Sequence, residues 1–405
     1  MLKSLCSHGK LETVAGGIMQ HPFPQGGIYM ATDQSVSTQP VPSQFLFDTT
    51  AAHQLEGTEL PNGWKIIRKT RTGQQDPDGT GGHFSVGYEA ERAGKKGFVK
   101  VFDLGGALRH HANNVMNALA SMSINHQYET SLLKVCEQAS LDRVVKVLAQ
   151  DQVMIPAASG MTIPLPYIIF EMADGGDLRK AVARTNAIDD AWRLRTLHQV
   201  AVGLQQLHGV SIAHQDVKPS NVLMFDNEGV GAKLGDLGRA SIKGGNASHD
   251  GGAIAGAIQY APPEQAYGVR AAEEWRDRRE SCDLYHLGCL ISFAFTGGTP
   301  NEAYASLPAT ILPPIWGGSW TGTYDMVYPH ISGVFAAYLN RIGQDFPAWG
   351  ADDLVSLVAQ LCNPDYRTRG APEARVTAGS PLGLNRFITR LDVLANKATI
   401  KAKSA

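Results

Sequence analysis

The sequence lacks several features that would place it in a specialised class of protein. It has no long run of one charge, and its 36 basic and 38 acidic residues give a formal net charge of −2, so we expect no nucleic-acid-binding surface. Its five cysteines are scattered without a Cys-x-x-Cys pair, which argues against a structural zinc site and favours reduced thiols. The apolar share of 43% is nevertheless ordinary for a globular protein with a core.

Long hydrophobic runs are also absent. The longest apolar stretch, residues 287–295, is too short to cross a membrane, and residues 1–20 contain no continuous apolar region of the kind found in signal peptides. We therefore expect a cytoplasmic protein that does not associate with a membrane.

The pattern of residue types divides the chain into four predicted segments. Residues 1–60 mix Gly, Pro, Gln, Ser and Thr without a period, which predicts an irregular extension. Residues 61–172 contain short strand-like runs and one helix-compatible stretch, whereas residues 173–395 show mostly helical spacing and 396–405 form a tail. The prediction is an α+β fold with two lobes: a small antiparallel β lobe with one main helix, and a larger, mostly helical lobe.

The strongest functional signal lies in IAHQDVKPSNVLMF, residues 212–225. There Asp216, Lys218 and Asn221 follow a long helical pattern at fixed offsets, so that one rigid loop could present a carboxylate to a nucleophile and an amide oxygen to a metal ion. A surface turn with the same letters is the alternative interpretation, because short motifs also match by chance. Fifteen residues after Asn221, AKLGDLGRAS places Asp236 at the end of a strand-like run, although an Asp-Xaa-Gly sequence taken alone is an ordinary turn.

These two motifs resemble the HRDxKxxN catalytic loop and the DFG element of eukaryotic-type (Hanks-type) Ser/Thr protein kinases. The resemblance implies that Asp216 accepts the proton of the attacked hydroxyl and that Lys218 neutralises charge on the transferred phosphoryl group. It also implies that Asn221 and Asp236 hold Mg²⁺, with Mn²⁺ as an alternative ion, and that ATP is the phosphate donor.

The resemblance extends to residues that would bind and align the nucleotide. Lys100 in FVKVFD matches the lysine that contacts the α and β phosphates, and Glu129 in YETSLL matches its helix partner, although such residues taken alone are usually exposed surface charges. The resemblance assigns nucleotide binding to Lys100 and to residues in the Gly-rich turn GTGGHFSVGY, in the hinge-like segment PYIIFEMADGGDL and just after Asn221. These residues are Gly79, Gly81, Gly82, Glu171, Ala173, Asp177 and Leu223. The Gly-rich turn fits its motif poorly, so a plain flexible hairpin remains an alternative there.

GAIQYAPPE, residues 256–264, resembles the end of a kinase activation segment. The resemblance implies an ion pair between Glu264 and Arg369, and support of the catalytic loop by Asp283. Ser241 and Ser248 precede this element and are predicted as exposed autophosphorylation sites. Because small-molecule phosphotransferases of the aminoglycoside type lack this segment, the resemblance favours a protein substrate.

Three residues depart from the family pattern and leave a second interpretation open. Gln215 replaces the arginine that reads an activation-loop phosphate in many kinases, Ala257 stands where Thr is common, and Phe98 replaces a small residue near adenine. A pseudokinase that binds nucleotide or partners without phosphoryl transfer is therefore the alternative to an active Ser/Thr kinase. Partner proteins could dock on residues 1–60 or on the aromatic segment 297–330, although a well-packed loop is the favoured interpretation of the latter.

Overall fold

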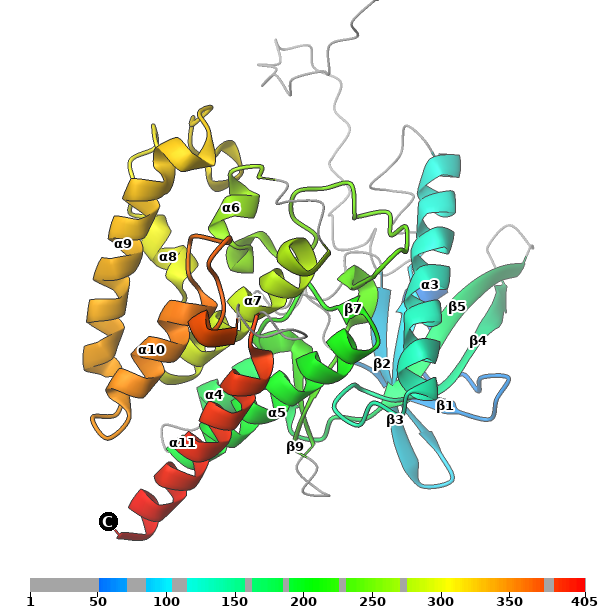
Figure 1. The fold of residues 1–405 in the computed structure, drawn as a ribbon. Coiled ribbons are helices and arrows are strands. Elements are labelled where there is room, and N and C mark those ends of the chain that lie inside the picture. The colour runs from blue at the N-terminus through cyan, green and yellow to red at the C-terminus, as the bar shows by residue number, and fades with distance from the viewer. Residues whose placement is uncertain are drawn as a thin grey trace, which may run out of the picture. The chain divides into compact units, whose positions relative to one another are not determined.

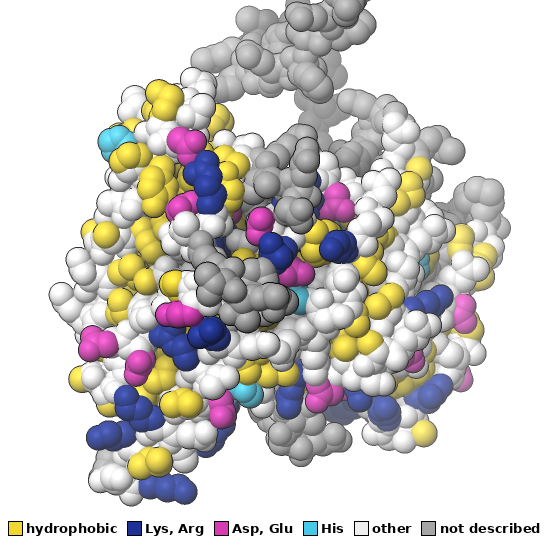
Figure 2. Space-filling view, in the orientation of Figure 1, with side chains coloured by type: hydrophobic (Ala, Val, Ile, Leu, Met, Phe, Trp, Pro, Cys, Tyr) yellow, Lys and Arg dark blue, Asp and Glu magenta, His cyan; other side chains and the backbone are white. Residues whose placement is uncertain are grey.

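The computed structural model describes residues 51–70, 85–103, 115–156, 162–184, 189–225, 231–269, 275–374 and 382–404. All of them belong to one compact unit, residues 44–405 (Figure 1). None of the helices in these ranges is long and apolar enough to span a membrane. On the face shown in Figure 2, basic and acidic side chains are interspersed and do not form separate patches.

The first part of this unit is a five-stranded antiparallel sheet with the strand order β1-β2-β3-β5-β4. Its strands are β1 (Lys65–Lys69), β2 (Ser85–Arg92), β3 (Lys95–Phe102), β4 (Val147–Pro156) and β5 (Thr162–Glu171). The turn between β2 and β3 consists of Ala93 and Gly94, both with positive φ, a backbone geometry that matches the twist of a two-residue hairpin. The predicted small antiparallel sheet is therefore present.

Alternation along the strands gives the sheet two different faces. Val99 and Val101 of β3 face one apolar cluster, while the residues between and beside them point to the opposite face. On that opposite face Phe102 belongs to a second cluster with Met122 and Leu132 of helix α3 (Val115–Gln138), the predicted main helix. The period of two thus directs Lys100, which lies between the two valines, toward α3.

Residues just before the predicted boundary at 60/61 pack with the sheet. Leu55 and Leu60 are fully buried in the cluster that contains Val99, and the hydroxyl of Tyr88 donates a 2.6 Å hydrogen bond to the carbonyl of Ala52. Residues 51–60 therefore contribute to the core of the β lobe, and the earlier residues of the predicted extension lie outside the described ranges.

The second part is mostly helical, as predicted from the periodicity. Its helices are α4 (Leu178–Arg184), α5 (Asp190–Gly209), α6 (Pro263–Ala266), α7 (Ser281–Thr296), α8 (Pro300–Tyr304), α9 (Tyr324–Asp345), α10 (Ala351–Leu361) and α11 (Leu384–Ser404). Short strands join them: β6 (Gly176–Asp177), β7 (Ile212–Ala213), β8 (Val222–Phe225), β9 (Gly231–Leu234) and β10 (Ser241–Ile242). Residues 396–404, predicted as a tail, form the last turns of α11, where Ala398 is buried.

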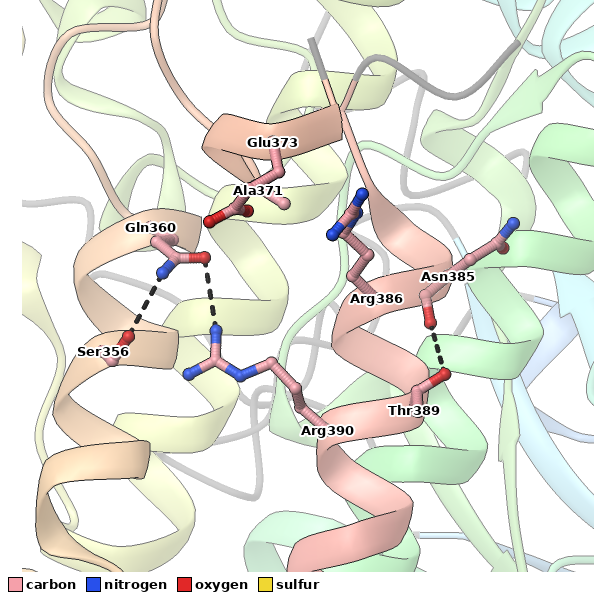
Figure 3. Close-up of a pocket in the computed structure, with 8 residues that line it drawn as sticks. All are labelled: Ser356, Gln360, Ala371, Glu373, Asn385, Arg386, Thr389 and Arg390. Atoms are coloured by element: carbon pink, nitrogen blue, oxygen red, sulfur yellow. Dashed lines mark hydrogen bonds between the residues drawn. The ribbon is translucent and has the colours of Figure 1, made fainter. Parts of the chain in front are cut away.

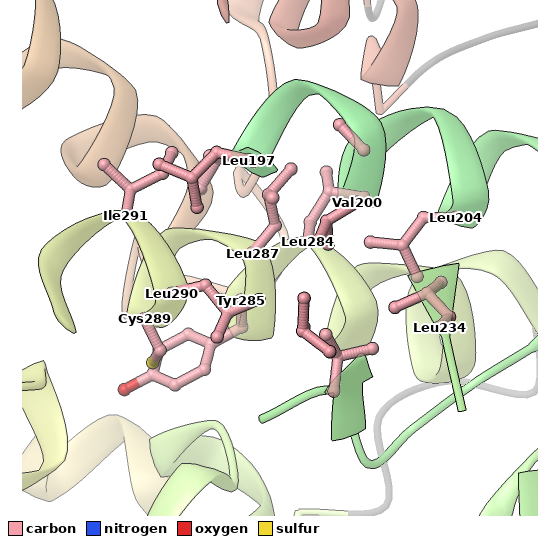
Figure 4. Close-up of a cluster of buried hydrophobic side chains, with 14 of the residues drawn as sticks. Leu197, Val200, Leu204, Leu234, Leu284, Tyr285, Leu287, Cys289, Leu290 and Ile291 are labelled. Carbon is pink, nitrogen blue, oxygen red and sulfur yellow. The ribbon is translucent and has the colours of Figure 1, made fainter. Parts of the chain in front are cut away.

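Helices α5 and α7 form the centre of the core. Leu197, Val200 and Leu204 of α5 meet Leu284 and residues one turn further along α7, as Figure 4 shows. The spacing of three and four residues places these side chains on one helical face, and the carboxylate of Asp189 caps α5 by accepting the Ala191 N–H. The loop that follows α5 therefore begins from a rigid support.

Several aromatic side chains of the segment 297–330 pack against the helical core. Tyr304 is fully buried and stacks on Trp316 with ring centroids 6.0 Å apart, while Trp316 meets the ring edge of Tyr267 at 5.9 Å. Leu312 and Tyr324 join the same core cluster. These aromatic side chains are packed as expected, but the segment is not a loop alone, since it contains α8 and the start of α9, and Ile315 and Met326 face solvent. Docking of a partner on this segment stays a prediction.

We expect His286 of α7 to make the stability of the folded protein depend on pH. Its side chain is buried and burial lowers its pKa to about 4, so between pH 6.5 and 4 the unfolded chain binds a proton that the folded chain does not. This contribution is fully present above pH 6.5, and we expect it to fall by about 1.4 kcal/mol per pH unit below that value. Chemical denaturation at pH 7.5, 6 and 5 checks this, since His286→Asn should flatten the dependence and the exposed control His330→Asn should not. An equal slope for both variants would contradict the prediction.

Candidate active site

The sheet, α3 and the strand end at Asp236 bring three charged groups together. Lys100 Nζ on β3 lies 2.8 and 3.1 Å from the two carboxylate oxygens of Glu129 and 3.2 Å from Asp236 Oδ1. Glu129 is buried, whereas the side chain of Asp236 remains 41% exposed. The predicted contact between Lys100 and Glu129 is therefore present, and Asp236 shares the same ammonium group.

This arrangement favours the charged forms of Lys100 and Asp236. Lys100 lowers the pKa of Asp236 to about 2. Burial alone would lower the pKa of Lys100, but the charges of Asp236 and Glu129 outweigh it and raise that pKa. Asp236 also has a left-handed backbone (φ 57°), a costly conformation for a residue other than glycine that is often found at functional sites.

The loop after β7 holds Asp216 by several hydrogen bonds. Lys218 Nζ donates to Asp216 Oδ2 at 2.8 Å, and Asn221 Nδ2 donates to the same oxygen at 3.1 Å and to the Asp216 carbonyl at 2.8 Å. The backbone N–H of Ala257 donates to Asp216 Oδ1 at 2.8 Å. All three predicted residues of the loop are thus in contact, and the amide nitrogen of Asn221 faces Asp216 so that its oxygen points elsewhere.

Asp283 of α7 supports this loop from inside the protein, as expected. Its carboxylate accepts the backbone N–H groups of His214 and Gln215 at 2.8 and 2.7 Å, and it lies 2.8 Å from Nε2 of His208. Burial would raise the pKa of Asp283, but the hydrogen bond and charge of His208 overcome this and lower it. The carboxylate therefore fixes two successive amides directly before Asp216.

Gly256 allows the segment before Pro263 to approach the loop that carries Asp216. A Cβ at this position would collide with the carbonyl oxygen of Gln215 and lie 2.8 Å from Asp216 Oδ1. Only glycine fits here without displacing the loop, and the close approach places Ala257 N on Asp216.

We expect Gly256→Ala to lower any activity that depends on Asp216 by about 10- to 100-fold, because an ångström-scale misplacement of reacting groups has effects of that size. Gly251→Ala is the matched control, since no atom lies within 4 Å of a Cβ built there. Steady-state rates of the two variants, together with their thermal denaturation curves, check the prediction. If Gly256→Ala and Gly251→Ala had equal rates, the close contact at Gly256 would not affect activity.

The hinge-like residues are engaged mainly in structural contacts. The carboxylate of Glu171 accepts from Lys233 Nζ at 2.6 Å and from the backbone N–H of Lys146 at 2.8 Å. The carboxylate of Asp177 accepts the N–H of Lys180 at 2.8 Å at the start of α4.

Of the other residues assigned to nucleotide binding, Leu223 on β8 lies so close to Gly235 that a Cβ built there would come within 2.9 Å of its Cδ1. Ala173 packs at the margin of the core. Gly79, Gly81 and Gly82 lie outside the described residues. The nucleotide-binding assignments therefore remain predictions.

Glu264 and Arg369 form the predicted ion pair. Arg369 donates from Nη1 to Glu264 Oε1 at 2.8 Å and from Nη2 to Oε2 at 2.7 Å, and both side chains are buried. Arg369 also donates to Ser281 Oγ and to the carbonyl of Asn363. This bidentate pair ties the end of the segment 256–264 to the helical core.

The two candidate autophosphorylation sites differ in exposure. Ser241 on β10 is fully buried and its hydroxyl donates to Asp250 Oδ1 at 2.6 Å, so the expectation that it is exposed was wrong. A β-strand pairing with β7 removes it from solvent. Ser248 is exposed and donates to Asn125 Oδ1 at 2.6 Å.

Comparison with known proteins matches residues 164–376, more than half of the chain, to the protein kinase domain model. The chain belongs to the protein kinase family. This match begins at β5 and does not include Lys100 and Glu129, whose mutual contact is a structural observation and whose role stays a prediction. The expected α+β kinase fold is confirmed.

Three curated relatives of the kinase are named as serine/threonine-protein kinases. PknB of Mycolicibacterium smegmatis is 34% identical over 137 residues, which cover 34% of the chain and 21% of the relative. PknB of Mycobacterium tuberculosis H37Rv is 30% identical over 158 residues (37% and 24%), and RAD53 of Saccharomyces cerevisiae is 28% identical over 140 residues (33% and 17%). The chain therefore spans about a quarter or less of the length of these relatives.

The sequence motifs did not indicate every residue of the kinase site. Arg279 and Asp250 form a 2.7 Å ion pair beside the catalytic loop, and Gly256 makes the close contact described above. Arg279 lies in the charged stretch RDRRE, where no periodicity or spacing distinguishes a buried arginine from its exposed neighbours. Only the three-dimensional contacts identify these residues.

A pocket of about 630 Å³ lies away from these residues, between α10 and α11 of the kinase. Figure 3 shows Arg390 reaching from α11 to Gln360 on α10, which accepts its hydrogen bond at 3.2 Å. The pocket is lined by the basic side chains of Arg386 and Arg390, by the acidic side chain of Glu373 and by small polar groups. Apart from this pocket, the structure describes four of the five cysteines, Cys136, Cys282, Cys289 and Cys362, and all four are free and buried.

Proposed function

We propose that this kinase transfers the γ-phosphate of ATP to Ser or Thr hydroxyls of a protein substrate. The observation that carries the proposal is the set of hydrogen bonds around Asp216, whose carboxylate is fixed by Ala257 N, Lys218 and Asn221. A carboxylate held in this way can orient a hydroxyl nucleophile without having to reorganise during the reaction. The names of the relatives support the choice of Ser and Thr.

In this mechanism Asp216 orients the substrate hydroxyl and accepts its proton. Lys218, which lies 2.8 Å from the carboxylate, provides positive charge near the developing negative charge of the transferred group. Lys100, held by Glu129, contacts the α and β phosphates of ATP. Catalysis then consists mainly of positioning and charge neutralisation.

The residues present fit a Mg²⁺ site that also uses phosphate oxygens. The described residues contain no cluster of three or more His, Cys, Asp or Glu side chains that could bind a metal alone. Asp236 and Asn221 supply hard oxygen donors, and the amide nitrogen of Asn221 is occupied by Asp216. When bound there, Mg²⁺ or Mn²⁺ would neutralise phosphate charge.

The remaining nucleotide contacts in this proposal follow the sequence assignments. Gly79, Gly81 and Gly82 would approach the phosphates, Glu171 and Ala173 would contact adenine through backbone groups, and Leu223 would lie beneath the base. Asp177, whose carboxylate caps α4, would lie near the ribose. Support for this part comes from the family resemblance. For Glu171, Asp177 and Leu223 it comes also from their positions on β5, β6 and β8.

The test is transfer of radiolabel from Mg²⁺-ATP to the protein itself and to a generic basic protein acceptor. Wild type should label Ser or Thr, as acid hydrolysis and phosphoamino-acid separation reveal, and Asp236→Asn should abolish labelling. Asp345→Asn, at an exposed position, should label like wild type. Binding of Mg²⁺-ATP without any transfer would contradict the proposal and favour the pseudokinase alternative.

A further inference from the structure

The segment from β10 to Gly256 is anchored at several points. β10 pairs with β7, and the backbone N–H of Ile242 donates to the hydroxyl of Tyr128 on α3 at 3.0 Å. Ser248 donates to Asn125 on the same helix. The chain then turns back so that Asp250 faces the π-helical turn Arg276–Glu280.

Asp250 is the central anion of this segment. Its Oδ1 lies 2.7 Å from Arg279 Nη2 and accepts the hydroxyl of Ser241 at 2.6 Å, and its Oδ2 accepts the N–H of Ala247 at 3.1 Å. Arg279 donates again from Nη2 to the Asp250 carbonyl at 3.0 Å. Only 4% of the Arg279 side chain is exposed, so a buried guanidinium depends on this carboxylate for its charge partner.

The same arginine reaches the catalytic loop. Arg279 Nη1 donates to Oε1 of Gln215, and Nε2 of Gln215 donates to the hydroxyl of Ser241. Four side chains thus form a closed ring, which we call the anchor ring: Gln215, Ser241, Asp250 and Arg279. Gln215 has φ 59° and directly precedes Asp216, so the ring fixes a strained residue next to the proposed base.

We propose that Asp250 and Arg279 are positioning residues that hold the segment 241–256 against the catalytic loop without phosphorylation. A carboxylate paired with arginine provides the charge-assisted hydrogen bonds that a phosphate would otherwise supply. Gln215 stands where the family commonly has an arginine. Because its side chain is uncharged, it cannot form an ion pair with a phosphate, and it connects Arg279 to Ser241 instead. The ring also explains why residue 256 is a glycine, because the segment that the ring holds passes directly over Gln215 and Asp216 and leaves no room for a Cβ.

A phosphate on Ser241 would oppose this arrangement. Its hydroxyl is fully buried and lies 2.6 Å from the Asp250 carboxylate, so a phosphate there would place two anions in contact. The ring is therefore complete in the unmodified chain.

The inference rests on the proposed kinase activity, because its first readout is phosphoryl transfer to the acceptor protein. Asp250→Asn and Arg279→Met should lower kcat by about 10- to 100-fold with the KM for ATP unchanged, as expected for loss of a charge-assisted hydrogen bond. Asp277→Asn is the matched control, because Asp277 lies on the same turn but is 41% exposed and pairs with the exposed Arg276. Asp250→Glu, which keeps the charge, should recover part of the rate.

Treatment of the wild type with a protein phosphatase is the second test. We expect full activity from protein that mass spectrometry shows to be free of phosphate. Loss of activity on phosphatase treatment, or an unchanged kcat in both Asp250→Asn and Arg279→Met, would overturn the proposal.

Hydrogen exchange separates failure of this inference from failure of the proposed function. In Asp250→Asn the amides of residues 241–257 should exchange faster than in wild type and in Asp277→Asn, whether or not the protein transfers phosphate. If the wild type shows no transfer, the proposed function fails while this faster exchange still supports the anchor ring. Exchange equal to wild type would overturn the ring even in an active kinase.

Discussion

Asp216→Asn is expected to lower the rate of phosphoryl transfer by about 10²- to 10⁴-fold, the range typical for loss of a general base. The substitution keeps the size of the side chain and an oxygen that can accept the N–H of Ala257. It removes the negative charge that Lys218 and Asn221 contact. The substrate hydroxyl therefore loses the group that accepts its proton and the group that orients it.

Single-turnover transfer to a protein acceptor measures this effect, and binding of a non-hydrolysable ATP analogue measures affinity separately. Affinity should stay at the wild-type value because Asp216 contacts the loop and the segment around Ala257 rather than Lys100 or Asp236. Asp345→Asn serves as the exposed control. A transfer rate equal to wild type would remove Asp216 from the mechanism.

The short motifs predicted much of this site because each contains residues whose contacts are local. Asp216, Lys218 and Asn221 lie within six residues, and their mutual hydrogen bonds follow from one loop conformation. The antiparallel sheet was also predictable, since alternation along β3 already separates Lys100 from its valine neighbours. The pairing of Lys100 with Glu129 came from the resemblance, and the structure shows the contact.

Long-range contacts among polar residues were not predictable from the sequence. Arg279, Asp250 and Ser241 are separated by 29 and 9 positions, and nothing in composition indicates that they meet. The Gly-rich run ASIKGGNASHDGG predicts an exposed loop around Ser241, but pairing of β10 with β7 buries this residue. A period can predict which face of an element is buried, whereas the partner of a buried charge depends on the complete fold.

The second large effect concerns stability. Arg369→Leu should lower the free energy of unfolding by about 3–5 kcal/mol, because it leaves the buried carboxylate of Glu264 without its partner. Burial alone would lower the pKa of Arg369, but Glu264 outweighs it and raises that pKa, so the guanidinium is charged in the folded protein at any accessible pH. The substitution also removes the hydrogen bonds that Arg369 donates to Ser281 Oγ and to the carbonyl of Asn363.

Arg367→Leu is the matched control, because Arg367 lies two residues away and pairs with Asp325 at 3.0 Å, but both of these side chains are largely exposed. Denaturant unfolding should show no measurable change for this control, since solvent screens exposed ion pairs. The double variant Glu264→Leu/Arg369→Leu should be more stable than Arg369→Leu, because no unpaired charge remains in the core. Equal destabilisation by the two single arginine variants would show that burial of the Glu264–Arg369 pair is irrelevant, and that the end of the segment 256–264 is held by its apolar contacts instead.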